Sequence, residues 1–297
     1  MIIGSQDDVT SDALAAMERT ADPRVREILM SLVKHLHGFI REVRLTEDEF
    51  RQATAVLNEM GKLSTDTHNE SVLMAGSLGV SSLVCLLNNG GNGNTETSQS
   101  LLGPFWRLNS PRVANGGTIV RSDTPGDPLL VTARVVNTAG KPIAGAEVDI
   151  WHASPVGLYE SQDPEQADMN LRGKFTTDED GRFWFATVKM IGYPIPTGGV
   201  VGRMLQAQNR HPYRPAHLHA LIVKEGFKVL ISQVYDPKDL HIDTDPQFGV
   251  TKALLGDWTL HEERHPTDPR LRPPWYSLDY TYVMEPGETK LPAAPIK

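Results

Sequence analysis

The period of the hydrophobic pattern changes near Gly93, and this change restricts the possible folds more than any other feature of the sequence. Before it, apolar residues recur every three or four positions, which predicts amphipathic helices. After it, prolines and glycines become frequent and the apolar runs shorten to strand length, over residues 129–136, 147–151, 182–188, 218–223, 230–235 and 280–283. Short strands separated by turn signals favour an antiparallel β-sandwich. We therefore expect an α+β chain, with a helical N-terminal domain over residues 1–95 packed on an antiparallel β-sandwich domain over residues 96–297.

The helical part contains one clear helix start. Thr46 is expected to cap a helix there, and Glu49 is expected to return a hydrogen bond to it in a capping box. This helix is expected to end at Gly61. A further helix is expected over residues 70–87, followed by a glycine- and asparagine-rich loop over residues 88–93.

Net charge and cysteine content exclude several classes of protein. The 297 residues carry a net charge of −8, which argues against nucleic acid or an anionic membrane as a partner. The single cysteine, Cys85, excludes an internal disulfide framework and a cysteine-based zinc site, and it fits a reducing compartment. No apolar run reaches the roughly 18 residues that cross a membrane, and the first residues lack the pattern of a secretory leader. We expect a cytoplasmic protein that is not embedded in a membrane.

Two histidines in the strand-rich region are candidates for a metal site. His217 and His219 stand at the start of an apolar run, and the two-residue period of a strand places both on one face. Two imidazoles on one face of a rigid strand are well placed to hold one metal ion. By itself, however, such a pair is more simply explained as ordinary core or surface histidines, so further ligands are needed.

Two tyrosines in loop-like segments upstream, Tyr159 and Tyr193, could supply those ligands. Each alone is more simply a tyrosine half-buried at the edge of a loop. Together with the two histidines they form a consistent set, because phenolate is a hard anionic donor and imidazole suits iron. Two phenolates would balance much of the charge of Fe(III), whereas Zn²⁺ is expected to use Cys, His or carboxylate ligands.

Five motifs, in the same order along the chain, resemble those of the intradiol ring-cleavage dioxygenases, and within that family most closely the hydroxyquinol-cleaving enzymes. They are residues 102–105 (Leu-Gly-Pro-Phe), 148–152 (Val-Asp-Ile-Trp-His), 169–175 (Met-Asn-Leu-Arg-Gly-Lys-Phe), 193–196 (Tyr-Pro-Ile-Pro) and 211–219 (His-Pro-Tyr-Arg-Pro-Ala-His-Leu-His). The resemblance covers most of the chain, and several long motifs in order make it specific.

The resemblance implies a set of iron ligands and a reaction. One Fe(III) per chain would be bound by Tyr159, Tyr193, His217 and His219, together with a solvent hydroxide. The iron would act as a Lewis acid and template for a small aromatic diol or triol, whose ring O₂ then opens between two hydroxylated carbons. From hydroxyquinol this gives 3-hydroxy-cis,cis-muconate, or its tautomer maleylacetate. Tyr193 is the ligand expected to leave the iron and take up a proton when the substrate binds.

The resemblance also implies which residues surround the ring. Arg214 is expected to lie against the ring and stabilise negative charge that develops on it, and Gln233 is expected to lie near Arg214. With Arg214, the residues expected to border the substrate are Leu73, Gly76, Leu102, Gly103, Pro104, Phe105, Ile195, Pro196 and Gln247.

Two of these positions depart from the pattern of the hydroxyquinol-cleaving enzymes. Those enzymes tend to carry an aspartate where this chain has Gly76, and an apolar residue where it has Gln247. The missing carboxylate is expected to widen the pocket near Gly76, while the amide of Gln247 offers a donor and an acceptor to the third hydroxyl. We expect hydroxyquinol to be the best substrate, with substituted catechols also admitted.

Alternative functions remain open. The enzyme could instead open catechol or a chlorocatechol. A non-catalytic ligand-binding β-sandwich is less consistent, because such a module has no need of four ligands beside Arg214. The resemblance further implies a homodimer formed through residues 1–95, with a lipid held between the N-terminal helices in some members, and residues 96–297 as the catalytic domain. Three other histidines, His152, His211 and His241, match no ligand position.

Overall fold

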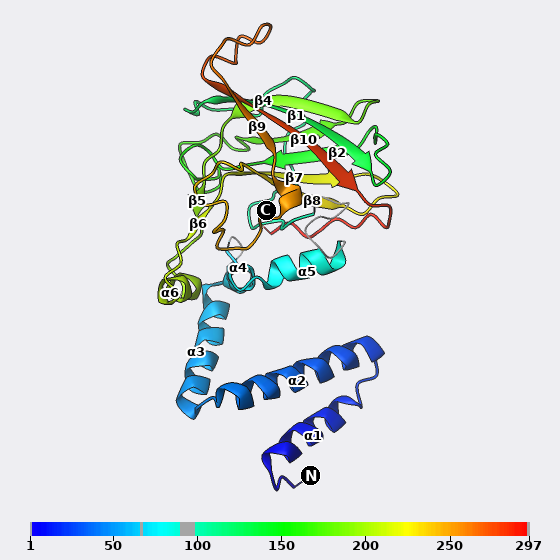
Figure 1. The fold of residues 1–297 in the computed structure, drawn as a ribbon, viewed down its shortest axis with the longest axis vertical. Helices are drawn as coiled ribbons and strands as arrows, with labels where there is room; N and C mark the ends of the chain where they lie inside the picture. Colours follow the sequence, from blue (N-terminus) through cyan, green and yellow to red (C-terminus); the bar gives the residue numbers. More distant parts are fainter. Residues whose placement is uncertain (1, 66–67, 90–98, 296–297) are drawn as a thin grey trace. The chain divides into compact units, whose positions relative to one another are not determined.

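The computed structural model describes residues 2–65, 68–89 and 99–295, and the chain divides into two compact units, Met1–Glu59 and Met60–Lys297 (Figure 1). The first unit contains α1 (Gln6–Met17), α2 (Pro23–Val43) and most of α3 (Glu47–Leu63). Asp22 starts α2 because its carboxylate accepts hydrogen bonds from the backbone N–H groups of Arg24 and Val25. Pro23 then occupies the first turn, where its missing N–H is not needed.

The predicted capping box at the start of α3 is confirmed. The backbone N–H of Glu49 donates to the hydroxyl of Thr46 at 3.3 Å, and the backbone N–H of Thr46 donates to the carboxylate of Glu49 at 2.8 Å. These hydrogen bonds hold the pKa of Glu49 below its usual value. The helix continues to Leu63, two residues beyond the expected end at Gly61.

The helix expected over residues 70–87 is two helices, α4 (Glu70–Ser77) and α5 (Val80–Asn88). The break falls at Gly79, whose φ of +74° lies in the left-handed region that favours glycine, and the two helix axes meet at 76°. Only the first two residues of the expected loop 88–93 lie within the described part of the chain.

Two four-stranded sheets form the body of the second unit. The first has the order β4-β1-β10-β9 and the second the order β3-β2-β7-β8, and a two-stranded ribbon joins β5 to β6. The strands are β1 (Pro128–Asn137), β2 (Glu147–Trp151), β3 (Arg172–Thr176), β4 (Arg182–Val188), β5 (Tyr193–Pro194), β6 (Tyr213–Arg214), β7 (His217–Val223), β8 (Leu230–Tyr235), β9 (Asp257–His261) and β10 (Trp275–Met284). The expected α+β class, with a sandwich following N-terminal helices, is confirmed.

One strand pair departs from the antiparallel expectation. Strands β1 and β10 pair in parallel, with Leu129 opposite Tyr276 and Val135 opposite Tyr282, whereas the other ladders in the described residues are antiparallel. The pair lies in the middle of its sheet. Strand β1 buries alternate side chains, and β10 buries Trp275, Leu278, Tyr282 and Met284.

The main core lies between the two sheets, and the period of two assigns each side chain to a face. In β7, Leu218, Ala220 and Ile222 belong to this core, together with Phe183 and Phe185 of β4. The intervening residues of β7 must therefore point away from the core, toward the outer face of the second sheet. In Figure 1, α4 and α5 lie on that side of β7 and β8, away from β1 and β4.

A short helix that the sequence pattern did not predict, α6 (Val200–Ala207), completes the second unit. The buried carboxylate of Glu70 in α4 accepts a hydrogen bond from the backbone N–H of Val201 at 2.9 Å. A Cβ at Gly199 would lie 2.4 Å from the same carboxylate, so a larger residue before α6 would have to displace the Glu70 side chain. One α4 side chain thus fixes where α6 begins.

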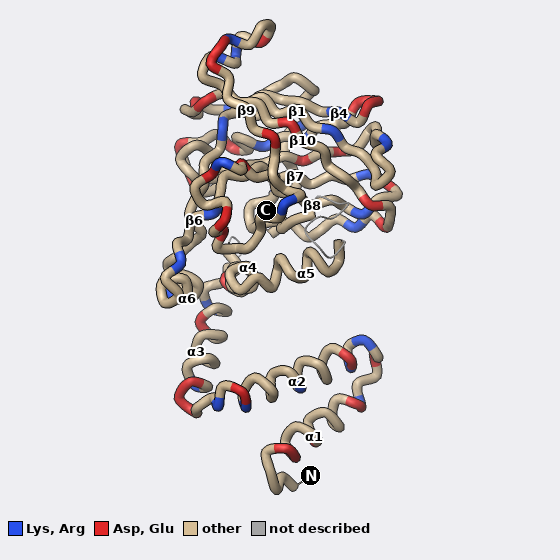
Figure 2. Tube along the Cα trace, viewed as in Figure 1, with Lys and Arg blue, Asp and Glu red and all other residues tan. Residues whose placement is uncertain are grey.

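Within the described residues no single helix is long and apolar enough to cross a membrane, and only α4 and α5 counted together would pass that test of length and composition. Charged residues of both signs are interspersed along the strands and loops of the second unit (Figure 2).

The expected domain boundary between residues 95 and 96 lies outside the described residues and stays a prediction.

Candidate metal centre

Strand β7 presents His217 and His219 on the outer face of the second sheet, as the period of two predicts. Both side chains are buried, and their ring centroids lie 4.8 Å apart. The Nδ1 of His217 lies 2.7 Å from the carbonyl oxygen of Pro215. A carbonyl only accepts, so Nδ1 carries the proton and Nε2 keeps its lone pair for the site.

The two tyrosines reach the same place from different segments. Tyr159 lies in the loop between β2 and β3, and Tyr193 begins β5. Their phenol oxygens lie 3.1 Å apart, and the oxygen of Tyr193 lies 3.3 Å from Nε2 of His217. The structure therefore brings together the four side chains that the sequence singled out, although they are spread over some sixty residues of chain.

Aromatic rings hold two of these four side chains in place. The indole of Trp151 stacks on the imidazole of His219, with ring centroids 4.7 Å apart and planes 9° apart. The ring of Phe105 stacks on the phenol of Tyr159, with centroids 4.3 Å apart. Such contacts restrict ring orientation, which a metal site requires of its donors.

Burial sets the protonation of this cluster. It lowers the pKa of His217 to about 3 and that of His219 well below its usual value, so both imidazoles are neutral near pH 7. It raises the pKa of Tyr193, and it raises that of Tyr159 well above its usual value. The phenols therefore keep their protons until a cation of high charge arrives to compensate the phenolates.

The donor set fits ferric iron. Among residues 2–65, 68–89 and 99–295, no group of three or more His, Cys, Asp or Glu side chains is arranged to hold a metal ion. A metal at this place therefore needs the phenols of Tyr159 and Tyr193, and hard anionic oxygens beside imidazoles suit Fe(III) better than Zn²⁺. The Nδ1 of His219 is buried and has no hydrogen-bond partner among the described residues.

Arg214 lies beside this cluster, held by a buried hydrogen-bond network. Its Nε donates to Oδ1 of Asp245 and its Nη2 donates to Oδ2, each at 3.1 Å. Its Nη2 also donates to Gln233 at 2.9 Å and to the hydroxyl of Tyr235 at 2.6 Å. Its Nη1 lies 3.4 Å from Nε2 of His217. The guanidinium is thus a fixed cation at the edge of the candidate centre.

Two partners of Arg214, Asp245 and Tyr235, were missed by the sequence reasoning, which found only Gln233. Burial alone would raise the pKa of Asp245, but the charge and hydrogen bonds of Arg214 outweigh it and hold that pKa below its usual value. The signal for Tyr235 was available, because it stands two residues after Gln233 and so shares its face of β8. No local pattern pointed to Asp245.

The residues expected to border the substrate pack in two different places. A Cβ at Gly103 would lie 3.1 Å from the imidazole of His219, and Phe105 and Leu102 pack in the cluster around Tyr159. Leu73 packs in another cluster, with Ile195. The expected roles of all of these as substrate contacts stay predictions, as do those of the exposed prolines Pro104 and Pro196.

The prediction that the pocket is wider near Gly76 is wrong. A Cβ at Gly76 would lie 1.9 Å from the amide oxygen of Gln247, so the Gln247 side chain fills the space that a larger residue would use. The amide nitrogen of Gln247 donates to the hydroxyl of Ser77 at 2.6 Å. The side chain that is missing at Gly76 is therefore compensated by the longer side chain of Gln247, and the space beside Gly76 stays filled.

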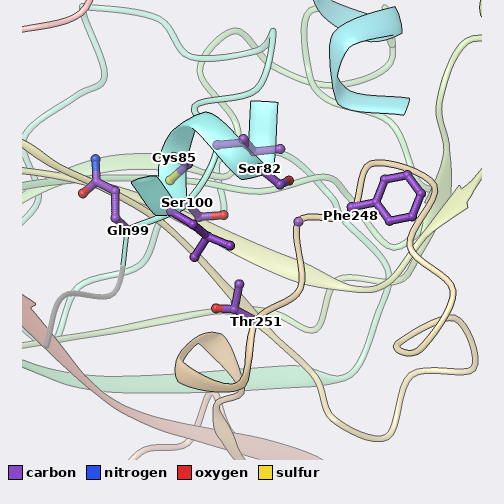
Figure 3. A pocket seen from close by; sticks show the side chains of 9 residues that line it. Ser82, Cys85, Gln99, Ser100, Phe248 and Thr251 are labelled. Carbon is purple, nitrogen blue, oxygen red and sulfur yellow. The ribbon is translucent and has the colours of Figure 1, made fainter. Parts of the chain in front are cut away.

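A small cavity lies beside α5 (Figure 3). One of its lining residues is Gly249, on which a Cβ would lie 2.8 Å from Nη2 of Arg214. The cavity is lined by residues of α5, including Cys85, by residues 99–101, and by Phe248, Gly249 and Thr251. Its volume of about 10 Å³ holds at most one water molecule. It is too small to receive an aromatic ring.

The three histidines that match no ligand position make other contacts. His152 is buried between the hydroxyl of Thr187 and the carbonyl oxygen of Ala153, and burial lowers its pKa to about 4. His211 lies near His241, with ring centroids 4.4 Å apart, in the segment that leads to Arg214.

Comparison with known families places the chain in a class. The family model described as "Dioxygenase" matches residues 102–284, and the model described as "Catechol dioxygenase N terminus" matches residues 22–95. The chain belongs to the intradiol ring-cleavage dioxygenase family.

Several individual members of this family are similar to the chain over most of its length. The chain is 41% identical to hydroxyquinol 1,2-dioxygenase of Rhizobium sp. (strain MTP-10005), over 84% of each chain. It is 37% identical to 6-chlorohydroxyquinol 1,2-dioxygenase of Cupriavidus pinatubonensis, over 95% of this chain and 98% of the relative. The solved structure of hydroxyquinol 1,2-dioxygenase from Pseudomonas putida DLL-E4 is similar with a TM-score of 0.85 and 35% identity, covering 95% of this chain and 99% of that one.

Proposed function

We propose that this protein is a non-haem Fe(III) dioxygenase that opens hydroxyquinol between two adjacent hydroxylated carbons. The observation that carries the proposal is the meeting of Tyr159, Tyr193, His217 and His219 beside the fixed cation of Arg214. A bound Fe(III) would supply Lewis-acid chemistry and a template for the two adjacent hydroxyls of the substrate. Substrate and O₂ together contain all the atoms of the diacid product.

Tyr193 is suited to receive a substrate proton. Its oxygen lies 3.1 Å from that of Tyr159 and 3.3 Å from Nε2 of His217. Because Tyr193 is buried and its pKa is raised above the usual value, a phenolate there is a strong base for a substrate hydroxyl. Its protonation would leave the other three side chains as ligands.

Arg214 is suited to stabilise negative charge on the substrate ring. Asp245, Gln233 and Tyr235 fix the orientation of its guanidinium before any substrate binds. A cation held in this way reorganises little during the reaction, and it acts in a site from which water is largely excluded. Gln233 thereby contributes to the reaction by orienting the guanidinium of Arg214.

The substrate assignment is supported by the relatives and by one polar side chain. Two relatives named for hydroxyquinol and 6-chlorohydroxyquinol match 84% and 95% of this chain at 41% and 37% identity. The buried amide of Gln247 offers hydrogen bonds to a third hydroxyl. Catechol is the second candidate, because catechol 1,2-dioxygenase of Candida albicans is 35% identical over 83% of this chain.

Oxygen uptake with a panel of substrates tests the proposal. The panel comprises hydroxyquinol, catechol, methylcatechols and chlorocatechols, and the iron content and visible spectrum of the purified protein are measured in parallel. We expect one iron per chain, a red-brown colour from phenolate-to-iron charge transfer, and the highest kcat/KM with hydroxyquinol. A colourless protein that binds no iron and consumes no oxygen would contradict the enzyme assignment. A coloured enzyme that prefers catechol would contradict only the substrate.

The N-terminal helices support a homodimer as part of the same proposal. In α2, the apolar residues Val25, Ile28, Leu32, Leu36, Phe39 and Val43 recur at three and four positions and are 45 to 57% exposed. Figure 2 shows few charged residues along the middle of this helix. An exposed apolar stripe of this length fits a second copy of the chain, or a lipid held between two copies.

The mass of the protein in solution tests this part of the proposal. We expect the parent to have twice the mass of one chain, and Leu32→Glu to give single chains. Lipid extraction followed by mass spectrometry tests for the lipid. The proposed division into a dimerisation domain over residues 1–95 and a catalytic domain over 96–297 agrees with the two family matches, which end at residue 95 and begin at residue 102.

A further inference from the structure

Arg172 lies in the row of residues that crosses the second sheet through His219. It is opposite Trp151, and Trp151 is opposite His219. All three are buried on the outer face of the sheet, and the indole of Trp151 stacks on the imidazole. The guanidinium of Arg172 is therefore built into the wall of the candidate metal centre, although it cannot itself be a metal ligand.

Two hydrogen bonds from Arg172 reach segments on either side of Tyr159. Its Nε donates to the carboxylate of Glu160, the next residue along the chain, at 2.6 Å. Its Nη1 donates to the carbonyl oxygen of Phe105 at 2.7 Å, and the ring of Phe105 stacks on that of Tyr159. One side chain thus holds both the backbone that carries Tyr159 and the ring that packs against it.

The charge of Arg172 also faces Tyr159 directly. The guanidinium carbon lies 5.9 Å from the centre of the phenol ring. The carboxylate of Glu160 balances this cation, and the same carboxylate oxygen accepts a hydrogen bond from Arg107 at 3.0 Å. Because the site is buried, the loss of either Arg172 or Glu160 would change the potential at the phenol oxygen, and the two changes would have opposite signs.

We infer that Arg172 is a positioning residue for Tyr159, which orients its ring through Glu160 and Phe105 and lowers the energy of its phenolate electrons. The inference rests on the proposed role of Tyr159 as an iron ligand. Arginine suits this task because its planar guanidinium makes two directed hydrogen bonds at once, which a lysine ammonium cannot do in the same geometry. Residues that orient a metal ligand in this way typically change metal affinity about 10- to 100-fold when mutated.

The visible spectrum and iron affinity of full-length variants test the inference. The variants are R172M, which removes the cation, R172K, which keeps it without both hydrogen bonds, and E160Q, which keeps the shape of the acceptor without its charge. The control is R112M, because the Arg112 side chain is 70% exposed and pairs with Glu147. Iron affinity is measured by competition with a chelator, and folding by circular dichroism.

The expected results differ in sign between the variants. The charge-transfer band moves to longer wavelength in R172M, because the phenolate electrons are held less tightly, and to shorter wavelength in E160Q. In R172K the band stays near that of the parent while the dissociation constant for iron rises about 10-fold. The control keeps both the band and the affinity of the parent.

Two kinds of result would overturn the inference. Bands and iron affinities equal to those of the parent in folded variants, with only thermal stability reduced, would leave Arg172 a purely structural residue. If R172M does not fold, an unmoved band in E160Q overturns the inference in the same way. A parent protein without iron or a visible band would remove the proposed metal site and this inference together, whereas a coloured parent with unmoved variant bands removes the inference alone.

Discussion

The amide oxygen of Gln247 occupies the space beside Gly76, so closely that a Cβ on Gly76 would lie 1.9 Å from it. The two residues are 171 positions apart, on α4 and on the loop that follows Asp245. Asp245 accepts a hydrogen bond from the backbone N–H of Gln247 at 3.1 Å and also binds Arg214. The Gly76–Gln247 contact is therefore connected to the proposed catalytic cation through one carboxylate.

Gly76→Ala tests this contact. Alanine normally favours a helix interior over glycine, but here its methyl group displaces the Gln247 side chain from its hydrogen bond with Ser77. We expect the free energy of unfolding to fall by about 1 to 3 kcal/mol. Gly38→Ala in α2, where a Cβ meets nothing within 4 Å, should be neutral or stabilising. In chemical denaturation, a Gly76→Ala/Gln247→Ala double variant that recovers none of the loss would refute the steric explanation.

Gln247→Val tests the role of the amide in substrate choice. If the amide binds the third hydroxyl of hydroxyquinol, its removal leaves that hydroxyl without a partner, at a penalty of about 1 to 3 kcal/mol. We expect kcat/KM to fall about 10-fold for hydroxyquinol relative to catechol. Gln206→Val, on the exposed face of α6, is the control. Equal losses with both substrates would show that Gln247 shapes the pocket without reading the hydroxyl.

Much of the sandwich could be predicted because its strands bury alternate or continuous apolar side chains. The expected strands 147–151, 182–188 and 230–235 match β2, β4 and β8 to the residue. Strand β10 is longer than expected, because Ser277 and Asp279 interrupt the apolar pattern in its first half. Strands β3 and β9 were missed, since β3 begins Arg-Gly-Lys and β9 is an edge strand in which only Trp258 is buried.

The candidate site was predictable to different degrees. The period of two places His217 and His219 together. No spacing rule places Tyr159 near Tyr193; they were candidates as tyrosines in loop-like segments, and the resemblance to the family then supported them as a pair. The filled space at Gly76 depends on a residue 171 positions away, so the single-site argument for a wider pocket failed. The parallel pairing of β1 with β10 likewise depends on distant segments.

Tyr193→Phe tests the proposed mobile ligand. Phenylalanine preserves the buried ring but removes the oxygen that contacts Tyr159 and His217. We expect a folded protein that keeps some iron, a shifted visible band, and a turnover reduced about 100-fold because the proton acceptor is lost. Tyr213→Phe, on the neighbouring strand β6 and 44% exposed, should keep the parent spectrum and rate. A parent-like spectrum and rate in Tyr193→Phe would exclude Tyr193 as a ligand.

Asp149→Asn tests a buried carboxyl on the outer face of β2. Burial raises the pKa of Asp149 to about 6, despite hydrogen bonds that include one from Trp106. Between the unfolded pKa near 4 and the folded pKa near 6, the folded state holds a proton that the unfolded state has lost, so this group's contribution to stability is full at low pH and is lost as pH rises through 6.

Replacing that carboxyl removes the pH dependence it causes. In denaturation at pH 4 to 7, the stability of Asp149→Asn relative to the parent should rise by about 2 to 3 kcal/mol as pH increases. Asp180→Asn, which replaces an exposed carboxylate, should show no such trend. A stability difference that is constant across this range would mean that Asp149 is ionised in the folded protein.

Arg214→Lys tests the proposed catalytic cation. Lysine retains one positive charge, but its ammonium cannot reproduce the fork with Asp245 together with the bonds to Gln233 and Tyr235. We expect kcat to fall about 100-fold, the scale for losing one preorganised donor at developing negative charge. We expect KM to change much less, because in the proposed site the substrate hydroxyls bind the metal. Arg134→Lys is the control, because Arg134 is a half-buried residue of β1 whose Nε donates to the exposed carbonyl oxygen of Asp180. An unchanged kcat in Arg214→Lys would remove Arg214 from the mechanism, and a rise in KM alone would make it a substrate-binding residue.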